Sequence, residues 1–222
     1  MPVRFLTEDQ RARYGRFNAD PDQTQLGGFF HLDAASRRRA MACNGARNQL
    51  GWAVQVGTVR FLGTFLPDPT DVPTVVVEYV AAQLGLQQSD LKGYGEKEAR
   101  WDHQVQIRQL YGYTAFDPVQ WFILARWLYS RSWLANERPI VLFDLATHRL
   151  VENCVLLPGV SVLERLVSAV RERTTPRYRR SILTPARWRI PVGALPGPAA
   201  PRREWEAAMA LLRPHWTPPR SR

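Results

Sequence analysis

Apolar residues recur at helical spacing along residues 1–173, and turns rich in Pro, Gly and Asn separate the segments that they mark. The longest such segment is 46–63, which places Leu50, Ala53, Val54, Gly57 and Phe61 on one face. This pattern predicts an all-α fold, a multi-helix bundle with helix-turn-helix-like units. The expected helices are 8–18, 21–31, 34–43, 46–63, 74–85, 96–111, 118–136, 139–153 and 161–173.

Polar residues at the predicted helix starts sharpen this picture. Thr7 and Gln10 have the spacing of a capping box, and Asp33 and Ser161 are expected N-caps. Pro21 is expected to open the second helix. Within 96–111 the amphipathic pattern predicts that four side chains face inward: Trp101, Val105, Ile107 and Leu110.

The pattern changes after Arg173, where prolines interrupt every helical periodicity. We therefore expect a helical domain over 1–173, undivided or made of subdomains 1–66 and 72–173. Residues 174–222 are expected to form a Pro/Arg-rich, largely disordered tail.

Charge is distributed unevenly between these two parts. Residues 166–222 hold 12 basic and 3 acidic side chains, whereas 1–165 hold 18 basic and 17 acidic ones. DNA binding by the helical part must therefore come from local patches rather than from a global field. Arg outnumbers Lys by 28 to 2, which suits bidentate phosphate and guanine contacts but is also what a GC-rich gene encodes.

The first candidate for such a patch is a helix-turn-helix unit formed by 34–43 and 46–63. Its second helix begins with three residues that could meet base edges, as the start of a recognition helix does: Arg47, Asn48 and Gln49. The preceding helix carries three residues that could hold phosphates: Arg37, Arg38 and Arg39. The alternative is an ordinary solvated, charged helix face.

A second candidate unit joins 139–153 to 161–173 through a turn at 156–160. Ser161 and Arg165 lie on the leading turns of its last helix, and Arg171 and Arg173 could contact phosphate. The alternative is a helix that packs in the core and exposes its arginines.

Other chemistry finds little support in the sequence. Asp102 and His103 are helical neighbours that point about 100° apart, so they do not converge on one ion, and Asp102 is expected to pair with Arg108 or another arginine. Cys43 and Cys154 have no metal-type spacing and are expected to be small buried side chains. No cofactor, metal site, membrane span or catalytic residue is expected, and the chain is predicted not to be an enzyme.

Short segments in a fixed order carry a resemblance to a known family. The longest is Leu50-Gly51-Trp52-Ala53 with the following 58–67, and further ones lie at 4–7, 11–15, 30–32, 60–72, 101–103, 107–108, 111–113, 126–129, 138–139 and 156–160. Together they resemble the N-terminal DNA-binding region of the large transposases of Tn-three family replicative transposons, over roughly 1–173. In that family the positions of Arg47 and Gln49 look more often like His and Arg, so base preference is expected to differ.

The resemblance implies an all-helical module, often labelled a domain of unknown function, that recognises the terminal inverted repeats of the transposon. In the family a later RNase-H-type domain binds magnesium, and we expect this chain to stop before it as a truncated or frame-shifted derivative. The predicted function is non-catalytic binding of double-stranded DNA at those repeats, in the bacterial cytoplasm and associated with the nucleoid. A full-length transposase or a second copy is a further expected partner. The alternative is a protein-interaction or regulatory fragment that associates with a full-length transposase without specific DNA binding.

Overall fold

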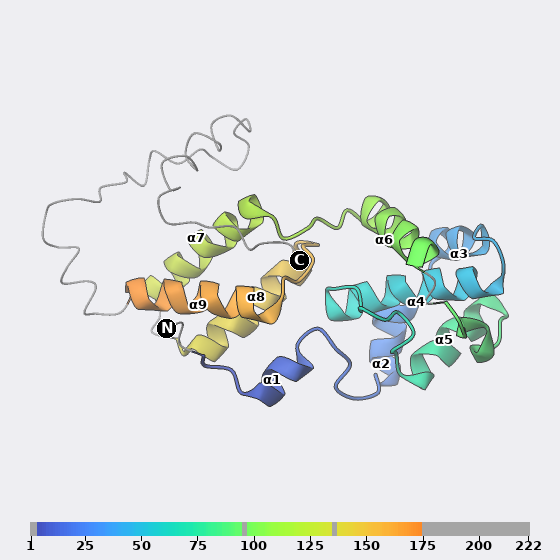
Figure 1. Cartoon of the computed structure of the whole chain (residues 1–222), viewed down its shortest axis with the longest axis horizontal. Coiled ribbons are helices and arrows are strands. Elements are labelled where there is room, and N and C mark those ends of the chain that lie inside the picture. The colour runs from blue at the N-terminus through green and yellow to red at the C-terminus, as the bar shows by residue number, and fades with distance from the viewer. Residues whose placement is uncertain (1–3, 95–96, 135–136, 175–222) are drawn as a thin grey trace, which may run out of the picture. The chain divides into compact units, whose positions relative to one another are not determined.

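The computed structural model describes residues 4–94, 97–134 and 137–174, which all belong to one compact unit, Met1–Thr175. Every regular element within these residues is a helix (Figure 1), which confirms the predicted all-α class. The predicted tail lies outside the described residues. The elements are α1 (Glu8–Arg13), α2 (Gln23–Gln25), the π-helix η1 (Leu26–Phe30), α3 (Ala34–Met41), α4 (Ala46–Leu62), α5 (Thr74–Leu84), the 3-10 helix η2 (Gln88–Leu91), α6 (Lys97–Tyr111), α7 (Pro118–Leu134), α8 (Pro139–Glu152) and α9 (Val160–Thr174).

Helix ends follow the local signals read from the sequence. Thr7 Oγ1 accepts the Gln10 N–H at 3.1 Å and Gln10 Oε1 accepts the Thr7 N–H at 3.0 Å, so the capping box is confirmed. Asp33 Oδ1 accepts the Ser36 N–H at 2.6 Å and caps α3. Gly63 ends α4 with φ +71°, a left-handed conformation that favours glycine.

Two predicted helix starts are wrong. Ser161 does not cap α9, because the Gly159 carbonyl already accepts the Val162 N–H at 2.8 Å and Ser161 lies within the first turn. Pro21 does not open the second helix, because Asp22 caps α2, which starts at Gln23.

The predicted orientation of α6 is wrong for three of its four residues. Trp101, Val105 and Leu110 are 57%, 49% and 54% exposed, and only Ile107 is buried. Helix α6 faces the first core with the stripe of His103 and Ile107. That stripe lies about 120–160° around the helix from Trp101 and Val105, at 100° per residue.

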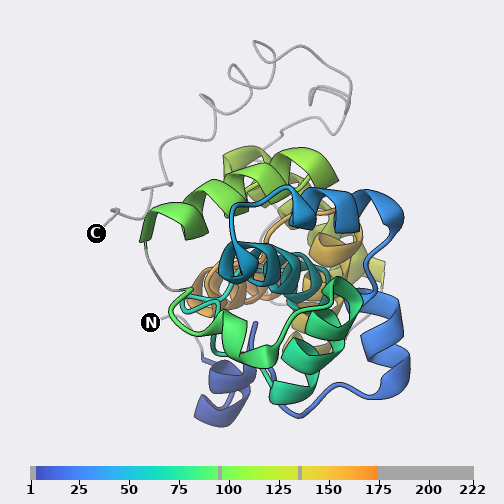
Figure 2. The same ribbon diagram turned by 90° about the vertical axis from the view of Figure 1, so that its right-hand side faces the viewer.

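Helix α4 is the centre of the first core, and Figure 2 looks nearly along its axis with other elements around it. Ten consecutive residues, Leu50 to Val59, are buried. Two glycines let neighbouring rings approach the helix closely. A Cβ on Gly51 would lie 2.2 Å from the ring of Tyr94, and one on Gly57 would lie 2.2 Å from the ring of Phe30.

A second core joins α7, α8 and α9 to the N-terminal segment. Buried Glu164 of α9 holds this segment: its Oε1 accepts the N–H of Phe5 at 3.0 Å and of Leu6 at 3.2 Å, and its Oε2 pairs with Arg11. Both carboxylate oxygens of Glu164 thus have partners, which a buried charge requires.

Apart from Leu6, the buried residues of the second core, from Leu124 onward, follow those of the first core, which end at Ile107. Backbone hydrogen bonds connect them, including Leu157 N–H to the Gly63 carbonyl at 2.9 Å. Whether subdomains fold independently stays a prediction. Within the described residues, no helix combines the length and apolar character needed to cross a membrane.

Candidate nucleic-acid interface

The three adjacent arginines of α3 are all exposed: Arg37, Arg38 and Arg39. Asp33 fixes where this helix begins, and hydrogen bonds from Ser36 lower the pKa of its carboxyl group. Arg38 and Arg39 lie in the last turn, where their charge also favours the carbonyl end of the helix dipole. The local sequence therefore places three exposed basic side chains on a firmly started helix, with successive ones about 100° apart around its axis.

The turn between α3 and α4 uses two of the three predicted base-reading residues for its own structure. The Gln49 amide donates to the carbonyls of Met41 at 3.3 Å and Cys43 at 3.2 Å. The Asn48 amide donates to the Asn44 carbonyl at 2.9 Å. These bonds satisfy carbonyls at the end of α3 and within the turn, so the amide donors of both residues are already engaged.

Arg47, the third predicted base-reading residue, has an exposed side chain. Its guanidinium lies beside Gly93, 3.5 Å from the position that a Cβ would take there. Beyond this first turn α4 is buried from Leu50 to Val59, so it could present no continuous face to a DNA groove. Between residues 46 and 59, only the first turn of the predicted recognition helix is therefore accessible, and base reading by this turn stays a prediction.

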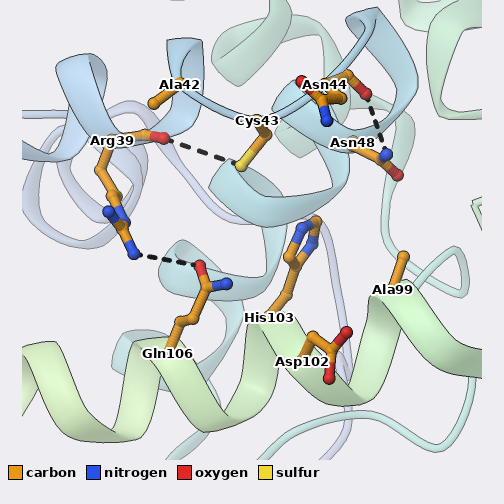
Figure 3. A pocket seen from close by; sticks show the side chains of 9 residues that line it. All are labelled: Arg39, Ala42, Cys43, Asn44, Asn48, Ala99, Asp102, His103 and Gln106. Carbon is orange, nitrogen blue, oxygen red and sulfur yellow. Dashed lines mark hydrogen bonds between the residues drawn. The ribbon is translucent and has the colours of Figure 1, made fainter.

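A polar groove of about 300 Å³ lies between this turn and α6 (Figure 3). Its lining comes from two sides: Arg39, Ala42, Cys43, Asn44 and Asn48 on one, and Ala99, Asp102, His103 and Gln106 on the other. Arg39 Nη2 donates to Gln106 Oε1 at 3.5 Å across the groove. Arg39 and Asn48, both predicted site residues, are thereby brought together with side chains of α6 that the prediction did not include.

A buried chain of hydrogen bonds joins α6 to α4 next to this groove. Gln55 Nε2 donates to the Tyr94 hydroxyl at 2.6 Å, and that hydroxyl lies 2.6 Å from His103 Nδ1. Burial raises the pKa of Tyr94 and lowers the pKa of His103. A neutral imidazole and a neutral phenol therefore fix the position of α6 against α4.

The predicted site residues of the second candidate unit differ in their exposure. Ser161, Arg165 and Arg173 are exposed on α9, whereas Arg171 is half-buried. Arg165 Nε donates to the Ser161 carbonyl at 3.0 Å, which orients the guanidinium along the helix. The other face of α9 is buried in the second core, so only one stripe of this helix remains accessible.

Asp102 has no hydrogen bond or ion pair among the residues that the structure describes, so the expected pair with Arg108 is not formed there. In the same described part of the chain, no group of three His, Cys, Asp or Glu side chains is placed to hold a metal ion. Cys43 and Cys154 are free and half-buried.

Comparison with known protein families shows to which family the chain belongs. The profile of the domain of unknown function DUF4158 matches residues 5–170. The chain belongs to this family. Transposases of the Tn-three family are its relatives, as the sequence motifs predicted.

Curated relatives of this DUF4158 domain include the transposase for transposon gamma-delta of Escherichia coli (strain K12), 43% identical over 192 residues. The transposase for transposon Tn1546 of Enterococcus faecium is 28% identical over 173 residues, and that for transposon Tn501 of Pseudomonas aeruginosa is 27% identical over 180 residues. These alignments cover 85%, 75% and 81% of this chain, but 19%, 17% and 17% of the three transposases. The chain thus spans less than a fifth of the length of these relatives.

Similarity to the gamma-delta transposase extends beyond the helical domain. Because 85% of 222 residues is about 189 residues, the alignment cannot end before about residue 189. It therefore continues past Arg173, the approximate end of the resemblance predicted from the sequence. Residues 175–221 also match the profile "Lantibiotic dehydratase, N terminus", a short match outside the described residues that shows no family for the chain.

The accessible polar face of α6 in the DUF4158 domain was missed from sequence. Asp102, Gln106 and Gln109 are separated by four and three residues, the spacing of a single helix stripe. This spacing is visible in the sequence. It was overlooked because Trp101 and Val105 were predicted to face the core, which gave α6 the wrong orientation.

Burial of His103 predicts that the DUF4158 domain loses stability in mild acid. The pKa of His103 is lowered in the folded state, while unfolded histidine titrates near pH 6.5. The unfolded chain therefore binds more protons as the pH falls below about 6.5, and unfolding becomes easier. Urea denaturation at pH 7.5 and pH 5.0 should show a smaller loss for His103→Gln than for the wild type, and parallel losses would contradict the assignment.

Proposed function

We propose that this DUF4158 domain binds double-stranded DNA at the terminal inverted repeats of a transposon and has no catalysis of its own. The observation that carries the proposal is the exposed arginine group around one turn: Arg37, Arg38, Arg39 and Arg47. Guanidinium groups form charge-assisted hydrogen bonds with phosphate oxygens. The relatives are transposases, and an enzyme that moves DNA segments must bind their ends.

The start of α4 adds support for a phosphate contact at the same turn. Gly45 precedes the helix with φ +80°, and no side chain caps it, unlike the starts of α1 and α3. The amide groups at a helix N-terminus and the positive end of its dipole favour an anion. A phosphate placed there would lie next to Arg47.

The exposed residues of α9 fit a second phosphate contact in this proposal. Arg165 and Arg173 are exposed on α9, at its leading and closing turns. Ser161 on the first turn adds a hydroxyl, and Arg171 is only half-exposed. In this role the second unit would position the duplex, while base reading takes place elsewhere.

Loss of the arginine group should weaken binding strongly. We expect Arg38→Ala, Arg39→Ala and Arg47→Ala combined to lower affinity for the repeat at least tenfold. Each lost phosphate contact should also reduce the slope of log K against log salt by about 0.9. The measurement is fluorescence anisotropy of the full chain with a repeat duplex and a scrambled duplex of about 40 base pairs, at two salt concentrations.

A matched control removes the same charge from elsewhere on the domain: Arg4→Ala, Arg13→Ala and Arg126→Ala, all at exposed positions. This control should bind the repeat within about twofold of the wild type. Equal affinity of the wild-type chain for the repeat and the scrambled duplex would refute specific binding.

Exposed apolar residues on α7 favour the second candidate function, association with a full-length transposase without specific DNA binding. Val119 and Ile123 are 42% and 39% exposed and lie four residues apart on one face. Large apolar side chains that gather on a surface are typical of protein contacts. Co-elution with the transposase that Ile123→Asp abolishes, together with no preference for the repeat, would support this candidate.

A further inference from the structure

We propose that α6, rather than α4, reads base edges in the DNA major groove, and that Asp102, Gln106 and Gln109 determine its specificity. The inference rests on the proposed function, binding of duplex DNA. It assigns base reading to a helix that is not part of either helix-turn-helix unit predicted from the sequence.

Accessibility separates the two helices. A recognition helix must project several side chains beyond the protein surface, because the bases lie at the floor of a groove about 8.5 Å deep. Helix α4 is buried over ten consecutive residues and exposes only its start. Helix α6 contacts α4 through the face of His103 and Ile107, whereas on the proposed stripe Asp102 and Gln109 are exposed and Gln106 is half-buried.

The length of the stripe along α6 corresponds to the rise of a few base pairs. Asp102, Gln106 and Gln109 follow each other at intervals of four and three residues, so they lie within about 60° of one another around the helix. They extend about 10 Å along its axis, which corresponds to about three base-pair steps of 3.4 Å. One stripe of this helix could therefore contact successive base pairs.

The chemistry of the stripe suits base edges better than phosphates. A glutamine amide can bond bidentately to adenine N6 and N7, and a carboxylate accepts the N4 amino group of cytosine. Asp102 lines the groove without a hydrogen bond or ion pair among the described residues, and a phosphate next to it would be repelled. Gln106 Oε1 accepts from Arg39, and its amide nitrogen is directed elsewhere (Figure 3).

Charge around the stripe identifies DNA as the occupant rather than an apolar protein surface. Arg39 lies across the groove on one side of the stripe. A cationic side chain beside a polar stripe matches a groove that is bordered by phosphate backbones.

The test compares α6 variants of the full chain on the repeat, on a scrambled duplex, and on a set of repeats that each carry one changed base pair. We expect Gln106→Ala with Gln109→Ala to reduce the preference for the repeat at least tenfold and to abolish discrimination at two or three adjacent base pairs. Asp102→Asn should tighten binding to the scrambled duplex, because a negative charge is lost, and should relax discrimination at one neighbouring position.

Matched controls come from the same chain. Gln104→Ala changes a half-buried glutamine away from the stripe on α6, and Asp71→Asn removes an exposed carboxylate before α5. Both should keep the wild-type preference, and circular dichroism should show equal helicity for all variants.

Two outcomes would overturn the inference, and they are distinguishable. If the double glutamine variant keeps its preference within twofold while Arg47→Ala loses it, the start of α4 reads the bases and the proposed function stands. If the wild type itself shows no preference for the repeat, the proposed function and the inference fail together.

Discussion

A Glu164→Ala variant is expected to lose about 3–5 kcal/mol of unfolding free energy, because it leaves a buried arginine without its counter-charge. The Arg11 side chain is only 13% exposed and pairs with Glu164, whose own side chain is 5% exposed. The same substitution removes the acceptor of the Phe5 and Leu6 N–H groups. Urea denaturation at pH 7 measures the loss, and release of the N-terminal segment should also speed proteolysis there.

Two further changes on α9 separate charge from hydrogen bonding. Glu164→Gln keeps an oxygen for the Phe5 and Leu6 N–H groups but loses the charge, so its loss should be smaller than that of the alanine variant. Glu172→Ala removes an exposed carboxylate from the same helix and should change stability by no more than about 0.5 kcal/mol. A Glu164→Ala variant within about 1 kcal/mol of the wild type would show that other contacts hold the N-terminal segment.

The second large effect is expected from Gly57→Ala, at about 2–3 kcal/mol of lost stability. The added Cβ would lie 2.2 Å from Cδ1 and 2.8 Å from Cε1 of Phe30. Phe30 is fully buried and its ring meets those of Phe17 and Phe61, so it has little room to move. This overpacking should exceed the gain of up to about 1 kcal/mol that alanine brings to a helix interior.

Gly27→Ala is the matched control, because nothing lies within 4 Å of a Cβ at that position. It should leave thermal stability unchanged or raise it slightly. Combining Gly57→Ala with Phe30→Leu should cost less than the sum of the two single changes, because the smaller side chain frees the space. Strict additivity would contradict the proposed clash.

Local chemistry made most of the helix boundaries predictable. Thr7 and Asp33 cap helices, and Gly63 and Gly85 end them, because each effect depends on residues within a single turn. The starts at Ser161 and Pro21 were wrong by one to two residues. There a neighbouring backbone carbonyl or Asp22 took the capping role.

Side-chain burial was less predictable, because it depends on which elements surround a helix. The pattern of α4 indicated one apolar face, but this helix is enclosed along ten residues, which Gly51 and Gly57 permit. In α6 the larger apolar side chains, such as Trp101, were assigned to the core. The core instead takes His103, whose ring nitrogen is satisfied by Tyr94, a residue that no periodicity connects to it.

For the candidate interface, the sequence showed where the basic residues lie, but not which of the predicted site residues are exposed and which are hydrogen-bonded within the turn. Exposure of Arg37 and Arg47 agrees with a binding role, which stays a proposal. That Gln49 and Asn48 would use their donors within the turn depends on the geometry of α3 against α4. Such a contact across a turn cannot be read from residue types alone.

The tie between the N-terminal segment and α9 has a consequence for how the chain folds during synthesis. Phe5 and Glu164 are 159 residues apart, whereas all buried residues of the first core lie in the stretch from Leu26 to Ile107. On a ribosome the first core can form while α7 to α9 are still being made, because synthesis adds only about 5–20 residues per second. Phe5 and Leu6 are made before the other residues of both cores, but they can dock only after Glu164 has emerged. Because this contact joins residues so far apart in the chain, docking of the N-terminal segment is expected to be a slow folding step.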